Sequence, residues 1–374
     1  MNKIYYFDHS ATTAVDEDVF KLMLPYFYIN YGNPSSVYSI GRKNKMTIEH
    51  AREKIAKIIN AKKNEIYFTS GGTESDNLAL KGVISSSKNA KKHIITSKIE
   101  HNAIINSCKT LENQGVEITY LNVDNKGRIN LQELENEIRP STLMISIMMA
   151  NNEIGTIQPI KEIGEIAKKR NIIFHTDAVQ AVGNLKIDVK EMNIDMLSMS
   201  AHKFYGPKGI GALYVREGIE FKEIQDGGHQ EKGKRAGTEN VAGIVGLSEA
   251  IEKSYKNIEI NNKHILNLRN YCMKEIEKNF NNIKFNGDIE NKLPGNINVS
   301  FIGKDSSEIL LKLDEYGICV SAGSACNTGS SNPSHVLTAI GLKSEELEGT
   351  IRISLGKENT KEEIDYLIEI LSKI

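Results

Sequence analysis

The sequence predicts an α/β fold in which a mainly parallel sheet is covered by helices. Apolar runs of strand length alternate along the first two thirds of the chain with segments whose apolar residues recur at helical spacing. Strands that alternate with helices are connected by crossovers, which make the sheet parallel and cover both of its faces. The 374 residues are 40% hydrophobic and 25% charged, so the chain can bury a large domain and a smaller one.

The larger unit is expected to contain seven strands separated by helices. The strands are predicted at residues 66–69, 94–96, 118–123, 143–150, 172–175, 194–200 and 209–215. Helices are predicted at 41–60, 101–113, 131–138 and 160–169, and another begins at 73–82. The last two strands are too close in the chain for a helical crossover, so we expect them to be antiparallel or separated in the sheet.

A smaller α/β unit is expected to follow. A long helical pattern over residues 239–280 precedes apolar runs at 296–301, 318–321 and 350–355. We place the boundary near residue 250. The large domain is therefore predicted at 13–250, and the small domain at 251–374 together with the N-terminal segment 1–12.

Charge and cysteine content argue against several classes of protein. The formal net charge of −1 disfavours nucleic acid or an anionic membrane as a direct partner, and no apolar run is long enough to span a bilayer. The four cysteines, at positions 108, 272, 319 and 326, include no Cys-x-x-Cys pair, so we expect no metal site built by this chain alone. The low cysteine count and the absence of a signal-peptide pattern favour a reducing cytoplasm.

A lysine lies just beyond the end of the predicted strand 194–200. Lys203 follows Ser200 and His202 and precedes a turn rich in glycine and proline at 204–209. An amine in that position can form a Schiff base with a carbonyl cofactor. The alternative is a solvated loop lysine, which is the usual environment of this residue type.

A glycine turn between the strand 66–69 and the next helix predicts a phosphate site. Gly71 and Gly72 allow backbone N–H groups to approach an anion, the helix N-terminus favours negative charge, and Thr73 adds a hydroxyl. The alternative is a plain turn with Thr73 as the helix cap. The motif is neither a Walker A loop nor Gly-x-Gly-x-x-Gly, which disfavours a Rossmann dehydrogenase.

Four further polar residues follow strand ends. Asp177 can keep a pyridine nitrogen protonated, or it can be a helix cap, and Gln180 lies three residues later. His101 can stack on a ring and move protons, or simply begin a helix. Asn152 supplies an amide, or it is a turn residue. Because the carboxyl ends of parallel strands share one edge, these groups and Lys203 together predict a pyridoxal phosphate site.

The motifs also occur in the order of a known family. The chain resembles cysteine desulfurases of the NifS/IscS type, in the class V aminotransferase branch of the fold-type I pyridoxal phosphate enzymes. The resemblance covers essentially the whole chain and implies the fold type I transferase architecture, with a seven-stranded sheet in the large domain. It rests on the motifs at 6–13, 31–36, 69–77, 100–101, 151–155, 175–180, 200–203, 235–240 and 321–327.

The resemblance implies a role for each residue of the predicted site. Lys203 would carry pyridoxal 5'-phosphate as a Schiff base, with His101 stacked on the ring and Asp177 at the pyridine nitrogen. Gln180 and Asn152 would reach the phenolic oxygen, and Asn152 also the substrate carboxylate. The phosphate would be held by Gly72, Thr73, Ser200 and His202.

Two more residues gain roles from the resemblance. Thr238 would reach the phosphate bound by a second subunit, so a homodimer is implied. Arg352 would hold the carboxylate of the substrate, in agreement with the bidentate geometry of a guanidinium group. The alternative for Arg352 is a surface ion pair at a strand edge.

The segment 321–333 is rich in glycine and serine, which predicts a mobile loop. Cys326 in this loop resembles the family's catalytic cysteine, which accepts sulfur as a persulfide; an incidental loop cysteine is the alternative. Cys326 could also ligate a cluster transiently together with a scaffold protein. Cys319 is expected to be buried in the preceding strand, and Cys108 and Cys272 are expected to be inert core residues.

The implied activity is removal of sulfur from L-cysteine, which yields L-alanine and a persulfide on Cys326. Lys203 would move the Cα proton, and His101 would act at the substrate thiol. An iron–sulfur scaffold or a tRNA-thiolation enzyme would accept the sulfur. The alternatives are a selenocysteine lyase or another class V aminotransferase and, from a different class, a non-catalytic sulfur-carrier subunit.

Overall fold

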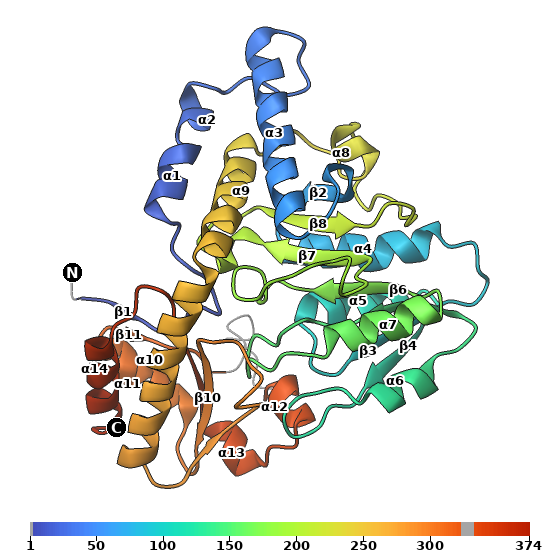
Figure 1. Cartoon of the computed structure of the whole chain (residues 1–374). Coiled ribbons are helices and arrows are strands. Elements are labelled where there is room, and N and C mark those ends of the chain that lie inside the picture. Colours follow the sequence, from blue (N-terminus) through green and yellow to red (C-terminus); the bar gives the residue numbers. More distant parts are fainter. Residues whose placement is uncertain (1–2, 323–332) are drawn as a thin grey trace.

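A seven-stranded sheet forms the centre of the computed structural model, which describes residues 3–322 and 333–374 (Figure 1). Its order is β2 (Ile66–Thr69), β8 (Gly211–Val215), β7 (Met196–Ser200), β6 (Ile173–Asp177), β5 (Thr142–Ser146), β3 (His93–Ser97) and β4 (Glu117–Leu121). The strands from β7 to β4 pair in parallel. Only β8 runs antiparallel to its neighbours, β7 and β2, so the prediction of a mainly parallel sheet is confirmed.

Both faces of this sheet are buried. One face packs with α3 (Ser39–Ile58), α7 (Ile160–Lys169) and α9 (Val241–Lys256), and the other with α4 (Gly72–Ser86) and α5 (Asn102–Glu112). Neighbouring residues enter opposite cores: Leu197 belongs to the first and Met196 to the second. This alternation follows from the two-residue period of a strand, and it explains why the strands read as continuous apolar runs.

Another hydrophobic cluster, separate from these two cores, lies in the last third of the chain. It forms around α10 (Ile258–Asn279), α14 (Lys361–Leu371) and an antiparallel sheet of β12 (Thr350–Ser354), β10 (Asn296–Phe301) and β9 (Ile283–Phe285). The N-terminal β1 (Tyr5–Tyr6) pairs in parallel with β11 (Ile318–Cys319), and Phe7 packs in the same cluster. The domain boundary near residue 250 stays a prediction. The separate hydrophobic cores agree with it.

The remaining elements are short. They are α1 (Glu17–Met23), α2 (Pro25–Tyr28), α6 (Leu131–Glu137), α8 (Gln230–Gly233), α11 (Ser306–Glu315), α12 (His335–Ala339), α13 (Ser344–Glu348) and the 3-10 turns η1 (Lys63–Glu65) and η2 (Ala201–Lys203). Among the described residues, we find no helix that is both long and apolar enough to cross a bilayer.

Three local predictions need correction. The helix expected over 239–280 is two helices, end to end in Figure 1, which meet at Asn257. The side-chain amide of Asn257 donates to the carbonyl of Lys253 (2.9 Å), and such competition for backbone groups favours a helix end. The strand 143–150 ends at Ser146, although the next residues remain beside β6. Cys319 is half-buried, because neighbouring side chains of a strand point to opposite sides and Ile318 is the one that faces the core.

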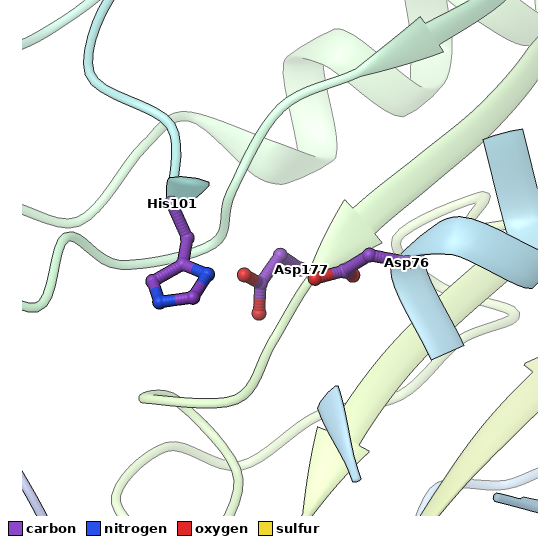
Figure 2. A group of neighbouring side chains, drawn as sticks. All are labelled: Asp76, His101 and Asp177. Atoms are coloured by element: carbon purple, nitrogen blue, oxygen red, sulfur yellow. The ribbon is translucent and has the colours of Figure 1, made fainter. Parts of the chain in front are cut away.

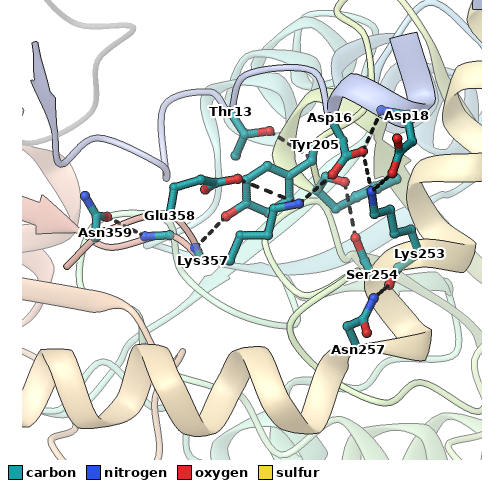
Figure 3. Close-up of polar contacts among 12 residues, drawn as sticks. Thr13, Asp16, Asp18, Tyr205, Lys253, Ser254, Asn257, Lys357, Glu358 and Asn359 are labelled. Atoms are coloured by element: carbon teal, nitrogen blue, oxygen red, sulfur yellow. Dashed lines mark hydrogen bonds and ion pairs between the residues drawn. The ribbon is translucent and has the colours of Figure 1, made fainter. Parts of the chain in front are cut away.

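Asp16 joins the N-terminal segment to helix α9 and to the chain beyond β12 (Figure 3). Its Oδ1 accepts the N–H of Asp18 as the cap of α1 and lies 2.6 Å from Lys253 Nζ. Its Oδ2 lies 2.7 Å from Lys357 Nζ. Burial alone raises the pKa of Asp16, but the hydrogen bonds from both ammonium groups outweigh it and hold that pKa well below its usual range.

Candidate active site

A cavity of about 180 Å³ opens at the carboxyl edge of the central sheet. The ends of β6 and β7 and the N-termini of α4 and α5 contribute to its walls. Nearly all predicted site residues line it, as expected for an open α/β sheet. These residues are Gly72, Thr73, His101, Asn152, Asp177, Gln180, Ser200, His202, Lys203 and Arg352.

Two predicted residues are not brought to this cavity. Thr238 is exposed in the segment between α8 and α9, and it does not line the cavity that the described residues form. Cys326 lies outside the described residues. The roles of both therefore stay predictions.

Lys203 is held at the cavity wall by backbone carbonyls. It ends the turn η2, which follows directly on β7. Its Nζ donates to the carbonyl oxygens of Ser10 (2.6 Å) and Ala11 (2.8 Å). The turn is tight because the N–H groups of Phe204 and Gly206 both bond the carbonyl of Ala201. The N-terminal segment thus positions the amine, which excludes a solvated loop lysine.

The side chains of Asp177 and His101, which both line the cavity, point toward each other (Figure 2), and one polar atom of each lies within 4.8 Å of the other. Asp177 ends β6, and its Oδ1 accepts the N–H of Val179 at 2.9 Å. Burial raises its pKa, while His101, the Val179 N–H and Lys203 act in the opposite direction. His101 also caps α5, since its Nδ1 accepts the N–H of Ala103 at 3.1 Å. In a neutral imidazole the proton therefore lies on Nε2.

The glycine turn before α4 leaves the helix N-terminus open to the cavity. The cap residue is Gly71, which has no side chain to bond the first N–H groups, so the alternative in which Thr73 caps this helix is wrong. A Cβ on Gly72 would lie 2.6 Å from Cγ2 of Val179, so only glycine fits there. Burial lowers the pKa of His202 to about 4, which makes its ring a neutral donor or acceptor.

Arg352 is buried, with 1% of its surface exposed, rather than a strand-edge surface residue. Its Nη2 lies 2.7 Å from Oδ1 of Asp8, and its Nη1 donates to the carbonyl of Asn152 at 3.0 Å. Its Nε has no partner among the described residues. The other oxygen of Asp8 accepts the hydroxyl of Ser321 at 2.7 Å. The guanidinium is therefore fixed in place at the cavity.

Sequence reasoning missed Asp8 and Asp76 as members of this site. Asp8 lies in the motif at 6–13, but its pairing with Arg352 depends on contacts across most of the chain. Asp76 follows Gly72 by four positions and Thr73 by three, so it shares their helix face, and this spacing was the signal available.

The family model described as Aminotransferase class-V matches residues 5–367. The chain belongs to the class V aminotransferase family. It is 53% identical, over 376 aligned residues, to a protein named cysteine desulfurase IscS from Clostridium botulinum, and the match covers 100% of this chain and 95% of that relative.

Two solved structures show which members of the class V aminotransferase family this chain resembles in its fold. A structure described as a NifS-like protein has a TM-score of 0.94 and 38% identity, with 99% of each chain covered. A structure described as SspA in complex with cysteine has a TM-score of 0.85 and 41% identity, with 95% of this chain and 99% of that chain covered. The expected resemblance to cysteine desulfurases of the NifS/IscS type is confirmed.

Proposed function

We propose that this chain is a pyridoxal phosphate-dependent cysteine desulfurase that transfers the sulfur of L-cysteine to Cys326. The observation that carries the proposal is a single cavity in which Lys203, Asp177, His101 and Arg352 meet. An amine nucleophile, a buried carboxylate, an imidazole and a guanidinium are the groups that amino-acid chemistry on a pyridoxal cofactor requires. The 53% identical relative named cysteine desulfurase supports the same reaction.

The residues fit pyridoxal phosphate. The open N-terminus of α4, where a Cβ on Gly72 has no room, suits the phosphate, with Thr73, Ser200 and His202 beside it. Asp177 and Gln180 line the same cavity, where Asp177 would pair with the ring nitrogen and Gln180 with the phenolic oxygen. When bound, the cofactor supplies an electron-withdrawing ring that stabilises negative charge at the substrate's Cα.

Lys203 and His101 would move protons between defined atoms. The Nζ of Lys203 takes the Cα proton of the substrate, since the carbonyls of Ser10 and Ala11 hold the amine at the cavity wall. The Nε2 of His101 exchanges a proton with the substrate sulfur, and the hydrogen bond from the Ala103 N–H to Nδ1 fixes the orientation of the ring.

Arg352 would bind the α-carboxylate of the substrate, together with the amide of Asn152. The guanidinium is already oriented by Asp8, so little side-chain freedom is lost on binding. The solved structure of SspA in complex with cysteine supports L-cysteine as the substrate here.

Cys326 would complete the reaction. Its thiolate attacks the sulfur of the substrate, the bond between that sulfur and Cβ breaks, and the electron pair stays on the carbon, which is then protonated. L-Cysteine and one thiol thus become L-alanine and one persulfide. The persulfide then passes to a sulfur-acceptor protein, such as an iron–sulfur scaffold or a tRNA-thiolation enzyme.

A homodimer completes the proposal. A group of large apolar side chains is exposed on α1, α2, the segment between α2 and α3, and the first half of α3, and a patch of this kind is typical of an interface with another protein chain. In a dimer, the exposed Thr238 would reach the phosphate in the second subunit. The apolar residues are Phe20, Leu22, Phe27, Tyr28, Ile29, Tyr31, Val37, Tyr38 and Met46.

We also propose that the enzyme works in the cytoplasm. Cys108, Cys272 and Cys319 are all free in the described part of the chain. Free thiols suit a reducing compartment, which would also keep Cys326 able to accept sulfur.

The test is a measurement of alanine and sulfide after incubation with L-cysteine and a thiol reductant. We expect equal amounts of both products, and pyruvate in place of alanine would refute the assignment. Cys326→Ala should abolish the reaction, whereas the matched Cys319→Ala should retain it. If Cys326→Ala keeps full activity on L-cysteine, the persulfide step is wrong, and activity only on L-selenocysteine would identify a lyase for that substrate.

A further inference from the structure

A second buried carboxyl group lies beside Asp177. Asp76, on the first turns of α4, is 1% exposed and lines the cavity. Figure 2 shows its carboxyl group beside that of Asp177, with His101 on the far side. One polar atom from each of these three residues lies within 4.8 Å of the others. The Oδ1 of Asp76 has no hydrogen-bond partner among the residues that the structure describes.

Among the residues that the structure describes, no cation lies behind Asp76 on the side away from the cavity. His175 Nε2 is 3.7 Å from Asp76 Oδ1, but its two ring nitrogens bond the hydroxyls of Ser198 (3.0 Å) and Ser146 (2.9 Å). Burial lowers the pKa of His175 to about 3, so this ring is neutral. Asp76 is therefore enclosed by neutral groups on the side away from the cavity.

The charged neighbours favour ionisation of Asp177 rather than Asp76. His101 and Lys203 lower the pKa of Asp177, whereas no cation in the described part of the chain lowers that of Asp76. Burial, followed by the negative charge of Asp177, raises the pKa of Asp76 well above its usual range, against a hydrogen bond from Ser198. The proximity of the two carboxyl groups, the hydrogen bond of Asp177 to the Val179 N–H and the directions of both shifts favour a proton on Asp76 rather than on Asp177.

We propose that Asp76 is a positioning residue: a neutral carboxylic acid whose O–H is directed at Asp177 and keeps that carboxylate charged and oriented toward the ring nitrogen of the cofactor. The inference rests on the proposed function. It assigns to α4 a second task, because the helix that offers its N-terminus to the phosphate also sets the charge at the opposite end of the ring.

The test compares two variants of the full chain that differ in hydrogen-bonding ability. Asp76→Asn keeps a neutral donor of the same shape, whereas Asp76→Ala removes it. We expect the dissociation constant of pyridoxal phosphate to stay within about threefold of the original in Asp76→Asn and to rise roughly 10- to 100-fold in Asp76→Ala. The pH dependence of cofactor absorbance should shift only in Asp76→Ala. The proposal would be overturned if both substitutions weakened cofactor binding equally, or if neither substitution weakened it.

A matched control and a second measurement keep the test independent of folding. Asp195→Asn alters a partly buried aspartate that accepts the Phe174 N–H and pairs with Arg216. It lies before β7, at the opposite end of that strand from the cavity, so the change should leave cofactor affinity unchanged. If Asp76→Ala does not fold, the infrared difference spectrum between the original protein and Asp76→Asn shows whether the Asp76 carboxyl group is protonated. A protonated carboxyl stretch at neutral pH supports the proposal, and an ionised carboxylate refutes it. If the original protein binds no pyridoxal phosphate, the proposed function fails instead.

Discussion

The ion pair between Arg52 and Glu231 anchors the segment that carries Thr238, and its removal should be costly. Both Arg52 Nη atoms lie 2.7 Å from Glu231 oxygens, and the N–H of Phe68 also donates to Glu231 at 2.8 Å. The side chains are 5% and 3% exposed. Glu231→Gln leaves the arginine charge buried, which typically costs about 3–5 kcal/mol. Glu49 lies 3.2 Å from Arg52 and still neutralises part of the arginine charge, so we expect the free energy of unfolding to fall by about 3 kcal/mol.

This loss can be measured as a shift in thermal unfolding. With about 2.1 cal/mol/K of unfolding entropy per residue, a chain of 374 residues should lose roughly 4 °C in Tm. The matched control is Glu249→Gln, which breaks a 2.7 Å pair with Lys54 at 26% exposure and should cost less than about 1 kcal/mol. Differential scanning calorimetry of both variants is the assay. Equal losses for the two, or a loss under about 1 kcal/mol for Glu231→Gln, would refute the reasoning.

Three further predictions concern the cavity and its surroundings. Lys203→Ala should remove the adduct that borohydride traps with pyridoxal phosphate and lower kcat by at least about 100-fold; an undiminished adduct would place the Schiff base on another lysine. Arg352→Lys loses the bidentate fork and should raise KM for L-cysteine roughly tenfold or more with a smaller change in kcat, and an unchanged KM would exclude it from the carboxylate site. Burial raises the pKa of Glu100 from 4.5 to about 8, so the folded state holds a proton that the unfolded state releases, and stability should fall as pH rises through that interval. Glu100→Gln should flatten this dependence in urea unfolding at pH 5 and pH 8, and an unaltered slope would assign it to other groups.

Local patterns predicted the strands and the residues at the cavity edge, because both depend on residues that are close together in the sequence. The strand 66–69 and the helix 160–169 appear with the predicted bounds, and the ends of β6 and β7 bring Asp177 and Lys203 to one cavity. Contacts between distant segments could not be predicted in this way. Nothing near Asp8 indicates Arg352, and the break at Asn257 interrupts a pattern that is helical on both sides.

The pairing of β1 with β11 has a consequence for the order of synthesis. The carbonyls of Ser10 and Ala11 that hold Lys203 follow β1, whose partner Ile318–Cys319 leaves the ribosome some three hundred residues later. A nascent chain that already contains Lys203 and the whole central sheet therefore lacks the partner strand of β1 and the arginine that pairs with Asp8. The cavity around the reactive amine is complete only when the last third of the chain has been made, because that part supplies Arg352 and the partner strand of β1.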